Sequence, residues 1–409
     1  MKFLILSQNS GSRKHGMVMR NYNWARALTQ MGHEVTVVGS SFSHSRQAQP
    51  QTKGRVTEEN IDGIRYLWLW GPKYGAKNAL GRVMSMFVFC LQLFLPDKRL
   101  RGSYDVVIAS SPPPFVIYPA HWRAKKMKAK LIFDARDLWP LTLKELGGYS
   151  ERHPFIWLMQ KSEDYACRHA DLVTAVAQNS ETYLQSRGLA KGRFMPMGNG
   201  LLSAKGNGPA DLLPQSLLDK LSDIRKQARL VVGYAGAIGL ANAMDTLIHS
   251  AAEVESDIHI ILFGGGPETE PLKSLSKQLG LMDRVHFMGT VSPEQVSLCL
   301  ECFDIAYVGL LKRDLYKYGA SLTKLNDYMQ AGKPIIYAAE DIGNAVEKSG
   351  CGIACSAENS ESVTKTIKRM SEMTDAERIE MGKAGQDWLY KHNMVEQHMS
   401  SLIMRIKNS

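Results

Sequence analysis

Residues 231–239, Val-Val-Gly-Tyr-Ala-Gly-Ala-Ile-Gly, decide the fold class of the second half of the chain. A short apolar run followed at once by small residues is typical of a buried strand that ends in a tight turn. Residues 258–263 repeat the pattern before Gly264-Gly265-Gly266, and 285–287 repeat it before Gly289. Helical patterns separate these runs. Such alternation predicts a parallel, doubly wound sheet in a Rossmann-like domain.

The first half of the chain alternates in the same way, so we expect two domains of the α/β class. Length supports this, because 409 residues exceed one ordinary core. Expected strands are 2–7, 35–39, 64–69, 106–109, 131–133 and 172–176, then 230–234, 258–263, 285–287, 304–307, 334–337 and 353–354. We predict an N-terminal domain at 1–200, a linker from 199 to about 224, a C-terminal domain at 201–375, and a final helical segment, 376–409, long enough to reach back to a neighbouring domain.

Composition and charge narrow the class of protein. The chain is 44% hydrophobic and 22% charged, as in globular proteins, and its formal net charge of +10 attracts anions such as nucleotides, phosphates and acidic lipids. The first residues lack a signal-peptide core, and the longest apolar stretch, 83–95, is shorter than the roughly 20 residues that span a bilayer. We therefore expect a cytoplasmic protein, with no nucleic-acid partner.

The six cysteines are expected to be reduced. Cys299-x-x-Cys302 and Cys351-x-x-x-Cys355 would supply four thiolates to a zinc ion if they met in space. The first pair lies inside a helical pattern, so ordinary buried cysteines are the favoured interpretation.

Two loops of the first half carry polar residues at expected strand ends, where ligands bind in open parallel sheets. Arg136 and Asp137 follow the strand 131–133, and we predict that they are catalytic: Arg136 holds a phosphate or acceptor oxygen, and Asp137 orients or deprotonates an acceptor hydroxyl. The alternative is an internal ion-pair cluster with Asp134. Gly16 follows the first strand and is predicted to let the backbone approach a nucleotide sugar, with a simple glycine turn as the alternative.

Small residues end three strands of the second half. Gly236 and Gly265 leave room for a bulky or phosphorylated ligand, and Gly289-Thr290-Val291 ends a third strand of the same domain. We predict that the three loops form one rim that binds the nucleotide sugar.

Residues 318–334 carry the strongest signal in the sequence. Ser321 is a plausible helix N-cap, which would leave the amides of Leu322 and Thr323 free beside the charge of Lys324. These groups together predict a diphosphate site. Asp327 lies one turn further along the same face, where its carboxylate would accept hydrogen bonds from ribose hydroxyls. The alternative is an amphipathic helix with a Lys324–Asp327 ion pair.

With these residues assembled, the sequence resembles the retaining glycosyltransferases of family 4. Among them it is similar to polysaccharide-assembly enzymes that transfer N-acetylated or deoxy sugars such as N-acetylfucosamine. The resemblance covers nearly the whole chain and rests on ordered motifs at 31–38, 136–140, 197–200, 264–267 and 323–334. It implies the GT-B fold, in which two Rossmann-like domains face each other across a cleft and the C-terminal helix crosses back to the N-terminal domain.

The resemblance also implies roles for particular residues. Leu322, Thr323 and Lys324 would contact the diphosphate, Asp327 the ribose, 289–291 the base, and 136–137 the reacting sugar or acceptor. The donor would be a UDP-sugar, and the reaction would retain anomeric configuration.

The chain departs from the family at three places. The family often has a glutamate where this chain has Gly319, an arginine and a lysine near Ala237 and 241–242, and a histidine at Arg136. Neutralisation of the phosphates would then depend on Lys324, with Lys312 or Arg313 as candidate helpers. No Asp-x-Asp metal motif is apparent, so we expect no cofactor and no metal, with the leaving group stabilised by helix-end amides and Lys324.

The expected acceptor is a polyprenyl-diphosphate-linked saccharide reached at the membrane surface. Residues 83–95 are flanked by basic residues, which describes an interfacial contact with anionic lipid, although a buried core helix with solvated basic ends fits equally well. Two other functions stay open: a sugar-nucleotide 2-epimerase of the same architecture, and a non-catalytic nucleotide-sugar-binding protein. A dehydrogenase is disfavoured because the chain lacks the glycine fingerprint of dinucleotide-binding domains.

Overall fold

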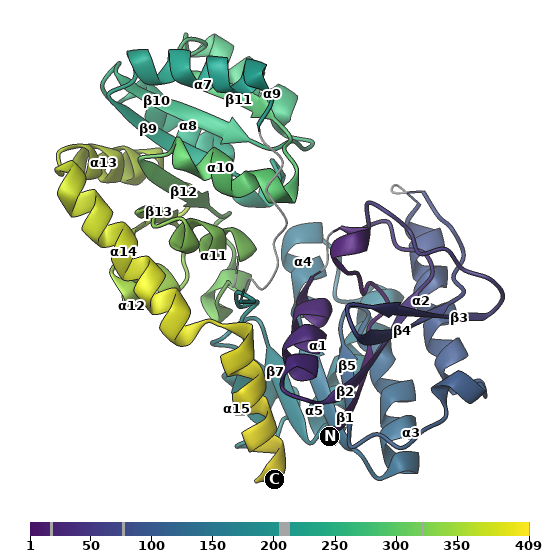
Figure 1. Ribbon diagram of the computed structural model, residues 1–409. Helices are drawn as coiled ribbons and strands as arrows, with labels where there is room; N and C mark the ends of the chain where they lie inside the picture. The colour runs from purple at the N-terminus through teal and green to yellow at the C-terminus, as the bar shows by residue number, and fades with distance from the viewer. Residues whose placement is uncertain (17–18, 76–77, 204–212, 321, 409) are drawn as a thin grey trace. The chain divides into compact units, whose positions relative to one another are not determined.

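The computed structural model describes residues 1–16, 19–75, 78–203, 213–320 and 322–408, and it divides into two compact units (Figure 1). Unit 1 comprises Met1–Ser203 together with Val395–Ser409, and unit 2 comprises Ala204–Met394. The chain therefore leaves unit 1 after residue 203 and returns to it at residue 395.

Unit 1 is built on a sheet with the strand order β3-β4-β2-β1-β5-β6-β7-β8. All neighbouring strands are parallel except β3 and β4. The strands are β1 (Lys2–Leu6), β2 (Glu34–Ser40), β3 (Val56–Ile61), β4 (Ile64–Leu69), β5 (Val106–Ser110), β6 (Lys130–Ala135), β7 (Leu172–Ala175) and β8 (Phe194–Pro196). The helices are α1 (Arg20–Gln30), α2 (Ala79–Phe94), α3 (Ile117–Met127), α4 (Leu141–Gly147), α5 (Pro154–His169), α6 (Glu181–Ser186) and α15 (Val395–Lys407), with short 3₁₀ turns at Arg13–His15, Lys98–Leu100 and Pro114–Val116.

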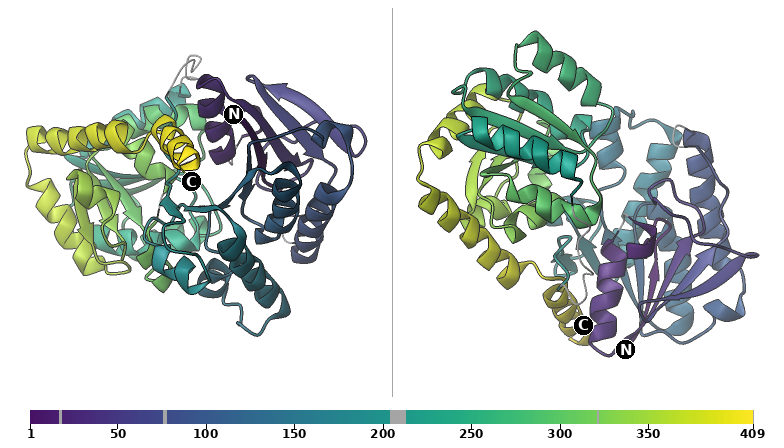
Figure 2. Two further views of the ribbon diagram at one scale, coloured as in Figure 1. Left: turned by 90° about the horizontal axis from the view of Figure 1, so that it is seen from below. Right: turned by 45° about the horizontal axis from the view of Figure 1, so that its top comes forward.

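The core of unit 1 includes the returning C-terminal segment. Strand β1 is apolar and buried from Phe3 to Leu6, as expected of a strand covered on both faces. Helix α1 packs against this sheet through the face that carries Trp24 and Leu28. Helix α15 lies beside α1 (Figures 1 and 2). Met399 of α15 is fully buried in the same apolar cluster. The last residues of the chain are thus part of the core of unit 1.

Unit 2 is a second parallel sheet with the order β11-β10-β9-β12-β13-β14. Its strands are β9 (Leu230–Ala235), β10 (Ile258–Phe263), β11 (Val285–Gly289), β12 (Ile305–Gly309), β13 (Ile335–Ala338) and β14 (Gly352–Cys355). Its helices are α7 (Gln215–Gln227), α8 (Met244–Ala252), α9 (Thr269–Gln278), α10 (Val296–Glu301), α11 (Thr323–Gln330), α12 (Ala345–Ser349), α13 (Ser360–Ser371) and α14 (Asp375–His392), with 3₁₀ turns at Leu240–Asn242, Pro293–Gln295 and Asp314–Tyr318.

The predicted fold class is confirmed, because both units are doubly wound α/β domains as in the GT-B fold. Three details differ from expectation. Strands β3 and β8 were not predicted, and α7 occupies much of the expected linker. The final segment, expected to run as one element over 376–409, is two helices, and its first part, α14, packs on α11 and α12 of unit 2.

Two glycines explain why α14 stays with unit 2. A Cβ on Gly382 would stand 1.8 Å from the carbonyl oxygen of Gly332, and a Cβ on Gly385 would stand 2.7 Å from the Cβ of Cys351. The helix backbone therefore lies directly against unit 2, and only the segment after Met394 crosses back.

Candidate functional site

The first turn of α11 carries Lys324, whose charge is balanced by no carboxylate of the described residues. The Nζ of Lys324 donates to the hydroxyl of Tyr234 at 2.7 Å and to Oδ1 of Asn242 at 2.8 Å, and it lies 4.3 Å from the centroid of the Tyr234 ring. It forms no ion pair with any residue that the structure describes. Burial lowers the pKa of Lys324 to about 8. A half-buried ammonium whose described partners are neutral groups is suited to binding an anion.

Asp327 lies one turn further along α11 and lines a pocket of about 540 Å³. The walls of the pocket include Pro293, Glu294 and Ser297. The carboxylate of Asp327 has no hydrogen bond or ion pair with any described residue, and burial raises its pKa to about 6. The ion pair with Lys324 that the alternative interpretation required is therefore not formed. Asp327 is left with two oxygens that can accept hydrogen bonds from a ligand.

The three loops after β9, β10 and β11 form one continuous rim. The amide of Ile238 donates to the carbonyl of Gly265 at 2.9 Å, and the amide of Gly264 donates to the carbonyl of Gly289 at 2.8 Å. A Cβ on Gly265 would meet the methyl group of Thr290 at 3.2 Å. The predicted residues Gly265 and Thr290, with the neighbouring Val291, are thus brought together.

Gly236 joins this rim to the lysine. A Cβ on Gly236 would lie 3.3 Å from the Nζ of Lys324, and the residue has a φ of 155°, which favours glycine. The oxygen of Gly236 itself leaves no room for a side chain on Gly264, whose Cβ would stand 1.8 Å from it. The absence of a side chain at Gly236 therefore leaves space beside the ammonium of Lys324 that an anionic ligand can enter.

Helix α11 begins differently from the expectation. Its N-cap residue is Leu322, with an extended backbone, and not Ser321, which lies outside the described residues. Because the cap is shifted by one residue, the first amides of the helix are those of Thr323, Lys324 and Leu325. Leu325 donates to the carbonyl of Leu322 at 3.1 Å, while Thr323 is exposed at the helix start. The N-cap is therefore not Ser321, and Thr323, one of the two residues whose amides are predicted to contact a diphosphate, is the first residue of the helix.

Arg136 and Asp137 lie in unit 1, in the loop that follows β6. The amide of Arg136 donates to the hydroxyl of Ser111 at 3.3 Å, which ties this loop to the one after β5. Neither the Arg136 guanidinium nor the Asp137 carboxylate pairs with a described residue, and Asp137 is exposed. Asp134 instead forms a buried ion pair with Arg20, at 2.8 Å. The alternative cluster of Asp134, Arg136 and Asp137 is therefore wrong.

Gly16 lies in unit 1, at the end of the 3₁₀ turn Arg13–His15. It has a φ of 60°, and a Cβ there would stand 2.6 Å from Oε1 of Gln47. The amide of Gln47 also donates to the carbonyl of His15 at 3.1 Å. The glycine therefore permits close packing against the chain near Gln47, which agrees with a structural turn. The next helix, α1, begins at Arg20.

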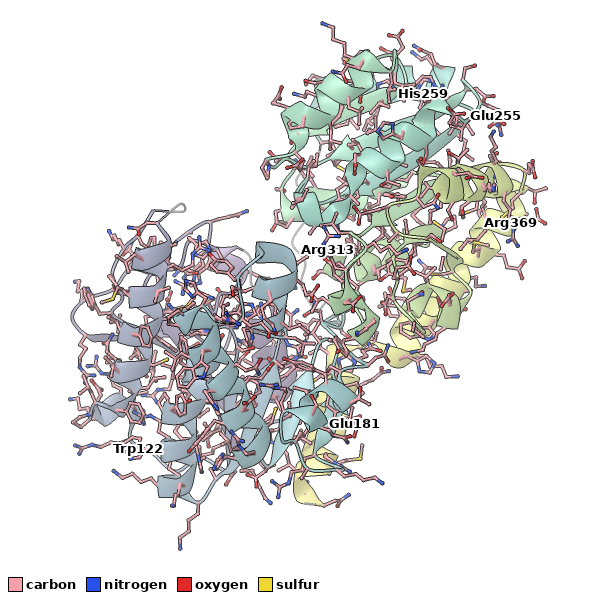
Figure 3. All side chains as sticks on the ribbon, turned by 180° about the vertical axis from the view of Figure 1, so that it is seen from behind. Trp122, Glu181, Glu255, His259, Arg313 and Arg369 are labelled. Carbon is pink, nitrogen blue, oxygen red and sulfur yellow. The ribbon has the colours of Figure 1, made fainter. Side chains whose placement is uncertain are left out.

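The two candidate helpers for phosphate binding are placed on the surface of unit 2. Arg313, marked in Figure 3, forms an ion pair with Glu358 at 3.5 Å. The amide of Lys312 donates to the same glutamate, at 2.5 Å. Glu358 thus anchors this segment and compensates the charge of Arg313. Lys324 is therefore the stronger candidate for binding the phosphates.

Sequence reasoning missed the residues that hold the site residues in place. Tyr234 and Asn242 position Lys324, and they were passed over because one belongs to an apolar strand and the other to a small-residue turn. Arg20 was missed because its partner Asp134 lies 114 residues away in the sequence. No local spacing signals such a pair.

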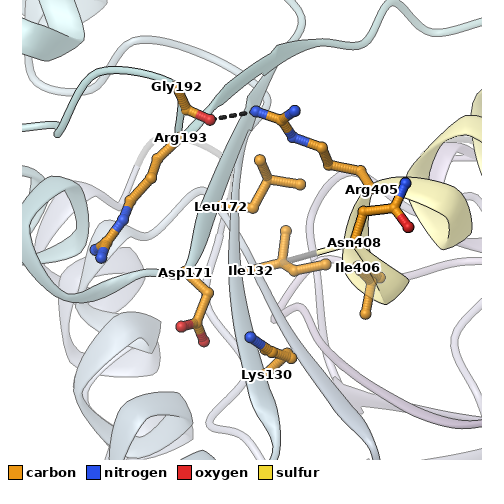
Figure 4. A pocket seen from close by; sticks show the side chains of 9 residues that line it. All are labelled: Lys130, Ile132, Asp171, Leu172, Gly192, Arg193, Arg405, Ile406 and Asn408. Carbon is orange, nitrogen blue, oxygen red and sulfur yellow. Dashed lines mark hydrogen bonds between the residues drawn. The ribbon is translucent and has the colours of Figure 1, made fainter.

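A second pocket, of about 290 Å³, lies in unit 1, at the edge of the sheet opposite to the loop of Arg136 and Asp137 (Figure 4). Lys130 and Leu172, the first residues of β6 and β7, line it together with Arg405 of α15. Arg405 donates to the carbonyl of Gly192. Ligands of open parallel sheets bind at the carboxyl ends of the strands, so this pocket is separate from the predicted chemistry.

The cysteines do not form the zinc site that was kept as an alternative. Within the described ranges, no group of three or more His, Cys, Asp or Glu side chains is arranged to hold a metal ion. Burial raises the pKa of Cys299 and Cys351 to about 11, as expected of thiols in a core. Among the described helices, none has the length and apolar character needed to cross a membrane.

Comparison with known families identifies both units. Residues 15–200 match the glycosyl transferase 4-like domain, and residues 229–373 match the glycosyl transferases group 1. The chain is a glycosyltransferase. The first match lies within unit 1 and the second within unit 2, so each doubly wound sheet corresponds to one of the two domains.

Solved structures resemble the glycosyltransferase over its full length. Sucrose-phosphate synthase from Thermosynechococcus elongatus is 14% identical, with a TM-score of 0.69, and the alignment covers 100% of this chain and 99% of that one. Anabaena HepE in complex with UDP and glucose is 15% identical, with a TM-score of 0.66 and full coverage of both chains. WaaG, described as a glycosyltransferase involved in lipopolysaccharide biosynthesis, is 11% identical, with a TM-score of 0.65 and coverage of 98% and 99%. These likenesses support the GT-B fold. No curated protein matches the sequence directly.

Proposed function

We propose that the enzyme transfers a sugar from a UDP-sugar to a lipid-linked saccharide during the synthesis of a surface polysaccharide such as an O-antigen or capsule. The observation that supports the donor half of the proposal is the half-buried ammonium of Lys324, which has no carboxylate partner among the described residues. The pocket beside Asp327 adds a place for the nucleoside. The complexes of HepE with UDP and with UDP-glucose, and the involvement of WaaG in lipopolysaccharide biosynthesis, fit this proposal.

The roles we assign follow from the chemistry of each group. Lys324 and the first amides of α11 neutralise the diphosphate as it departs, which is the main charge that develops in the reaction. Asp327 accepts hydrogen bonds from ribose hydroxyls, and Thr290 and Val291 contact the base. Arg136 serves the reacting sugar or the acceptor. With this division, unit 2 holds the donor and unit 1 supplies the acceptor side.

The proposed reaction retains anomeric configuration and proceeds without a bound metal ion. Lys324 supplies the positive charge that a divalent cation would otherwise provide to the leaving group. Asp137 orients the acceptor hydroxyl, and the departing diphosphate helps to remove its proton on the same face of the sugar. The sugar is proposed to be an N-acetylhexosamine or its deoxy form, on the basis of the family resemblance.

Release of nucleoside diphosphate tests the proposed function. The purified enzyme is incubated with a panel of UDP-, GDP- and TDP-sugars, with and without a detergent-solubilised polyprenyl-diphosphate saccharide, in buffer containing EDTA. We expect release that requires both a UDP-sugar and the acceptor and that persists in EDTA. Turnover of the donor without any acceptor would instead identify an epimerase. Tight donor binding without release would identify a binding protein.

The affinity for the donor should depend on pH at both ends of the neutral range. Lys324 is protonated below its pKa of about 8, and Asp327 is ionised above its pKa of about 6. Binding that needs both charges is therefore strongest between these values; it weakens as Lys324 loses its proton and as Asp327 gains one. The measurement is the dissociation constant of a UDP-sugar between pH 5 and pH 9. If the weakening of binding at alkaline pH disappears in Lys324→Met, it is due to deprotonation of Lys324. If the same weakening persists in this variant, Lys324 is not its cause.

We also propose that unit 1 meets the membrane through one face of α2 and α3. Several large apolar side chains on this face stand in solvent, although α2 buries its other side: Leu80, Met84, Leu91, Phe94, Leu95 and Trp122 are between 39% and 73% exposed. Trp122 lies at the periphery of unit 1 in Figure 3. Exposed lysines and arginines border it: Lys98, Arg101, Lys125, Lys126 and Lys128. Apolar residues beside basic ones suit an anionic lipid surface.

Arg123, next to Trp122 on α3, is structural and does not belong to this basic border. Arg123 is buried and donates to the carbonyl of Leu93, at 2.6 Å, and to that of Leu100, at 3.3 Å. The guanidinium thus holds the end of α2 against α3 and is not available to lipid.

Flotation with liposomes tests the membrane proposal. The wild-type enzyme should float with vesicles that contain anionic lipid, and added salt should reduce the bound fraction because it screens the basic border. Leu91→Glu, which places a charge in the exposed apolar face, should abolish flotation without affecting folding. Leu240→Glu is a matched control, because Leu240 is equally exposed, at 63%, but lies in unit 2. Absence of binding by the wild type at low salt would end this proposal.

A further inference from the structure

Arg20, the first residue of α1, forms a fully buried ion pair with Asp134, near the end of β6. The side chains of the two residues are 2% and 0% exposed. The Nε of Arg20 donates to Oδ2 of Asp134 at 3.2 Å, and its Nη2 donates to Oδ1 at 2.8 Å. The pair therefore has the two-point geometry that fixes a guanidinium in one orientation.

The same guanidinium binds the segment through which the chain leaves unit 1. Nη2 donates to the carbonyl of Met197 at 2.9 Å, and Nη1 donates to the carbonyl of Gly198 at 2.7 Å and to Oδ1 of Asn199 at 3.3 Å. With the two bonds to Asp134, all five N–H donors of Arg20 are used. Residues 197–199 follow β8 and precede the departure of the chain at 203.

Asp134 connects this anchor to the loop that carries Arg136. Its carboxylate also accepts hydrogen bonds from the hydroxyls of Ser110, at 2.8 Å, and Thr174, at 3.0 Å. Its carbonyl accepts from the amide of Ser111 at 3.0 Å, and the hydroxyl of Ser111 accepts from the amide of Arg136 at 3.3 Å. The ends of β5, β6 and β7 are thereby joined to one arginine.

Stability alone does not explain such a pair. Removing two charges from water costs about as much as their attraction returns, and well-packed apolar residues of similar volume often serve as well. What apolar residues cannot reproduce is the direction of five hydrogen bonds from a planar group. The arrangement is therefore suited to fixing distances between the segments that it joins.

We propose that Arg20 is a positioning residue, which sets the spacing between the loop of Arg136 and Asp137 and the segment 197–199. This inference rests on the proposed function, in which that loop serves the reacting sugar or the acceptor. Loss of the five-bond arrangement leaves the nucleotide site of unit 2 intact and displaces the acceptor side. A displacement of about 1 Å is enough to lower turnover by about 100-fold.

Arg20→Lys tests the proposal while keeping the positive charge. A lysine can pair with Asp134, but it cannot also bind all three acceptors at 197–199. We expect a folded protein with wild-type affinity for a UDP-sugar and a kcat lowered by about 10- to 100-fold. Arg26→Lys is the matched control on the same helix and should retain full turnover. Arg26 donates an exposed hydrogen bond to the carbonyl of Asp62.

Hydrogen exchange gives a second readout that does not need activity. The amides of 197–203 should exchange faster in Arg20→Lys than in the wild type and stay unchanged in Arg26→Lys. If Arg20→Lys does not fold, the double variant Arg20→Met with Asp134→Leu replaces it, because it removes both charges together. Hydrogen exchange and kcat are then measured on the double variant. Wild-type exchange, or wild-type kcat in a folded variant, would overturn the proposal. If the wild type transfers no sugar at all, the proposed function fails, and the exchange experiment alone decides whether Arg20 anchors the segment.

Discussion

Replacing Lys324 by methionine is expected to lower kcat/KM for the donor by about 10²- to 10³-fold, the loss typical of removing one preorganised charge donor from a reaction centre. Methionine has similar length and keeps the packing against the ring of Tyr234, so folding should be unaffected. The ammonium is the group that neutralises the departing diphosphate in the proposed mechanism. The measurement is steady-state release of nucleoside diphosphate, with thermal unfolding as the check on the fold.

The control for this variant is Lys226→Met in the same unit. Lys226 is exposed and pairs with Asp223 on α7, so its loss should change neither turnover nor stability measurably. Full activity in Lys324→Met would show that the diphosphate is neutralised elsewhere and would remove the main support for the donor site.

Gly264→Ala is expected to destroy nucleotide binding through the backbone. The added Cβ would stand 1.8 Å from the carbonyl oxygen of Gly236, and Gly264 has a φ of 130°, which side-chain-bearing residues rarely adopt. The rim of loops after β9 and β10 must therefore separate. We expect unit 2 to lose about 1–3 kcal/mol of stability and to bind no UDP detectably. Calorimetric titration and thermal unfolding measure the two effects.

Gly280→Ala separates the backbone strain from the collision. Gly280 also has a positive φ, of 70°, but nothing lies within 4 Å of the position that its Cβ would take. This variant should lose some stability and bind UDP as the wild type does. Equal loss of binding in both variants would mean that strain in unit 2, and not the closure of the rim, governs the nucleotide site.

Much of the fold could be predicted from the alternation of apolar strands with helices. The missing strands have physical reasons. Strand β3 contains Glu58 and Glu59 and pairs only with β4, where Glu58 forms an ion pair with Arg65. An edge strand stabilised by polar cross-strand pairs has no apolar run to detect. Strand β8 is three residues long and ends in Pro196, which is too short for a periodicity.

The division of the final segment could not be predicted from periodicity. The helical pattern continues through 376–407, but the chain breaks at Asn393, whose side chain donates to Oδ1 of Asn326 at 2.8 Å. That contact lies inside unit 2 and involves residues far apart in the sequence. Tertiary packing thus decides where the segment leaves one unit for the other.

The candidate site was predictable where its chemistry is local. Lys324 and Asp327 occupy one helix face, and the glycines at strand ends indicated a rim, because spacing along the chain fixes both features. The partners of these residues come from other elements, so their contribution appears only in three dimensions. Arg20 is the clearest case, since five acceptors from two distant segments surround a residue that has no motif of its own.

Titration of UDP and of 2′-deoxy-UDP into the wild type and Asp327→Ala is the measurement that tests the donor site most directly. We predict that the wild type binds UDP and prefers it to the deoxy form, because the carboxylate of Asp327 accepts hydrogen bonds from the ribose. Asp327→Ala should bind UDP about 10- to 100-fold more weakly and lose that preference, as expected for hydrogen bonds to a charged group. Equal affinity of both proteins for UDP, with the preference unchanged, would contradict the assignment of α11 as the nucleotide site.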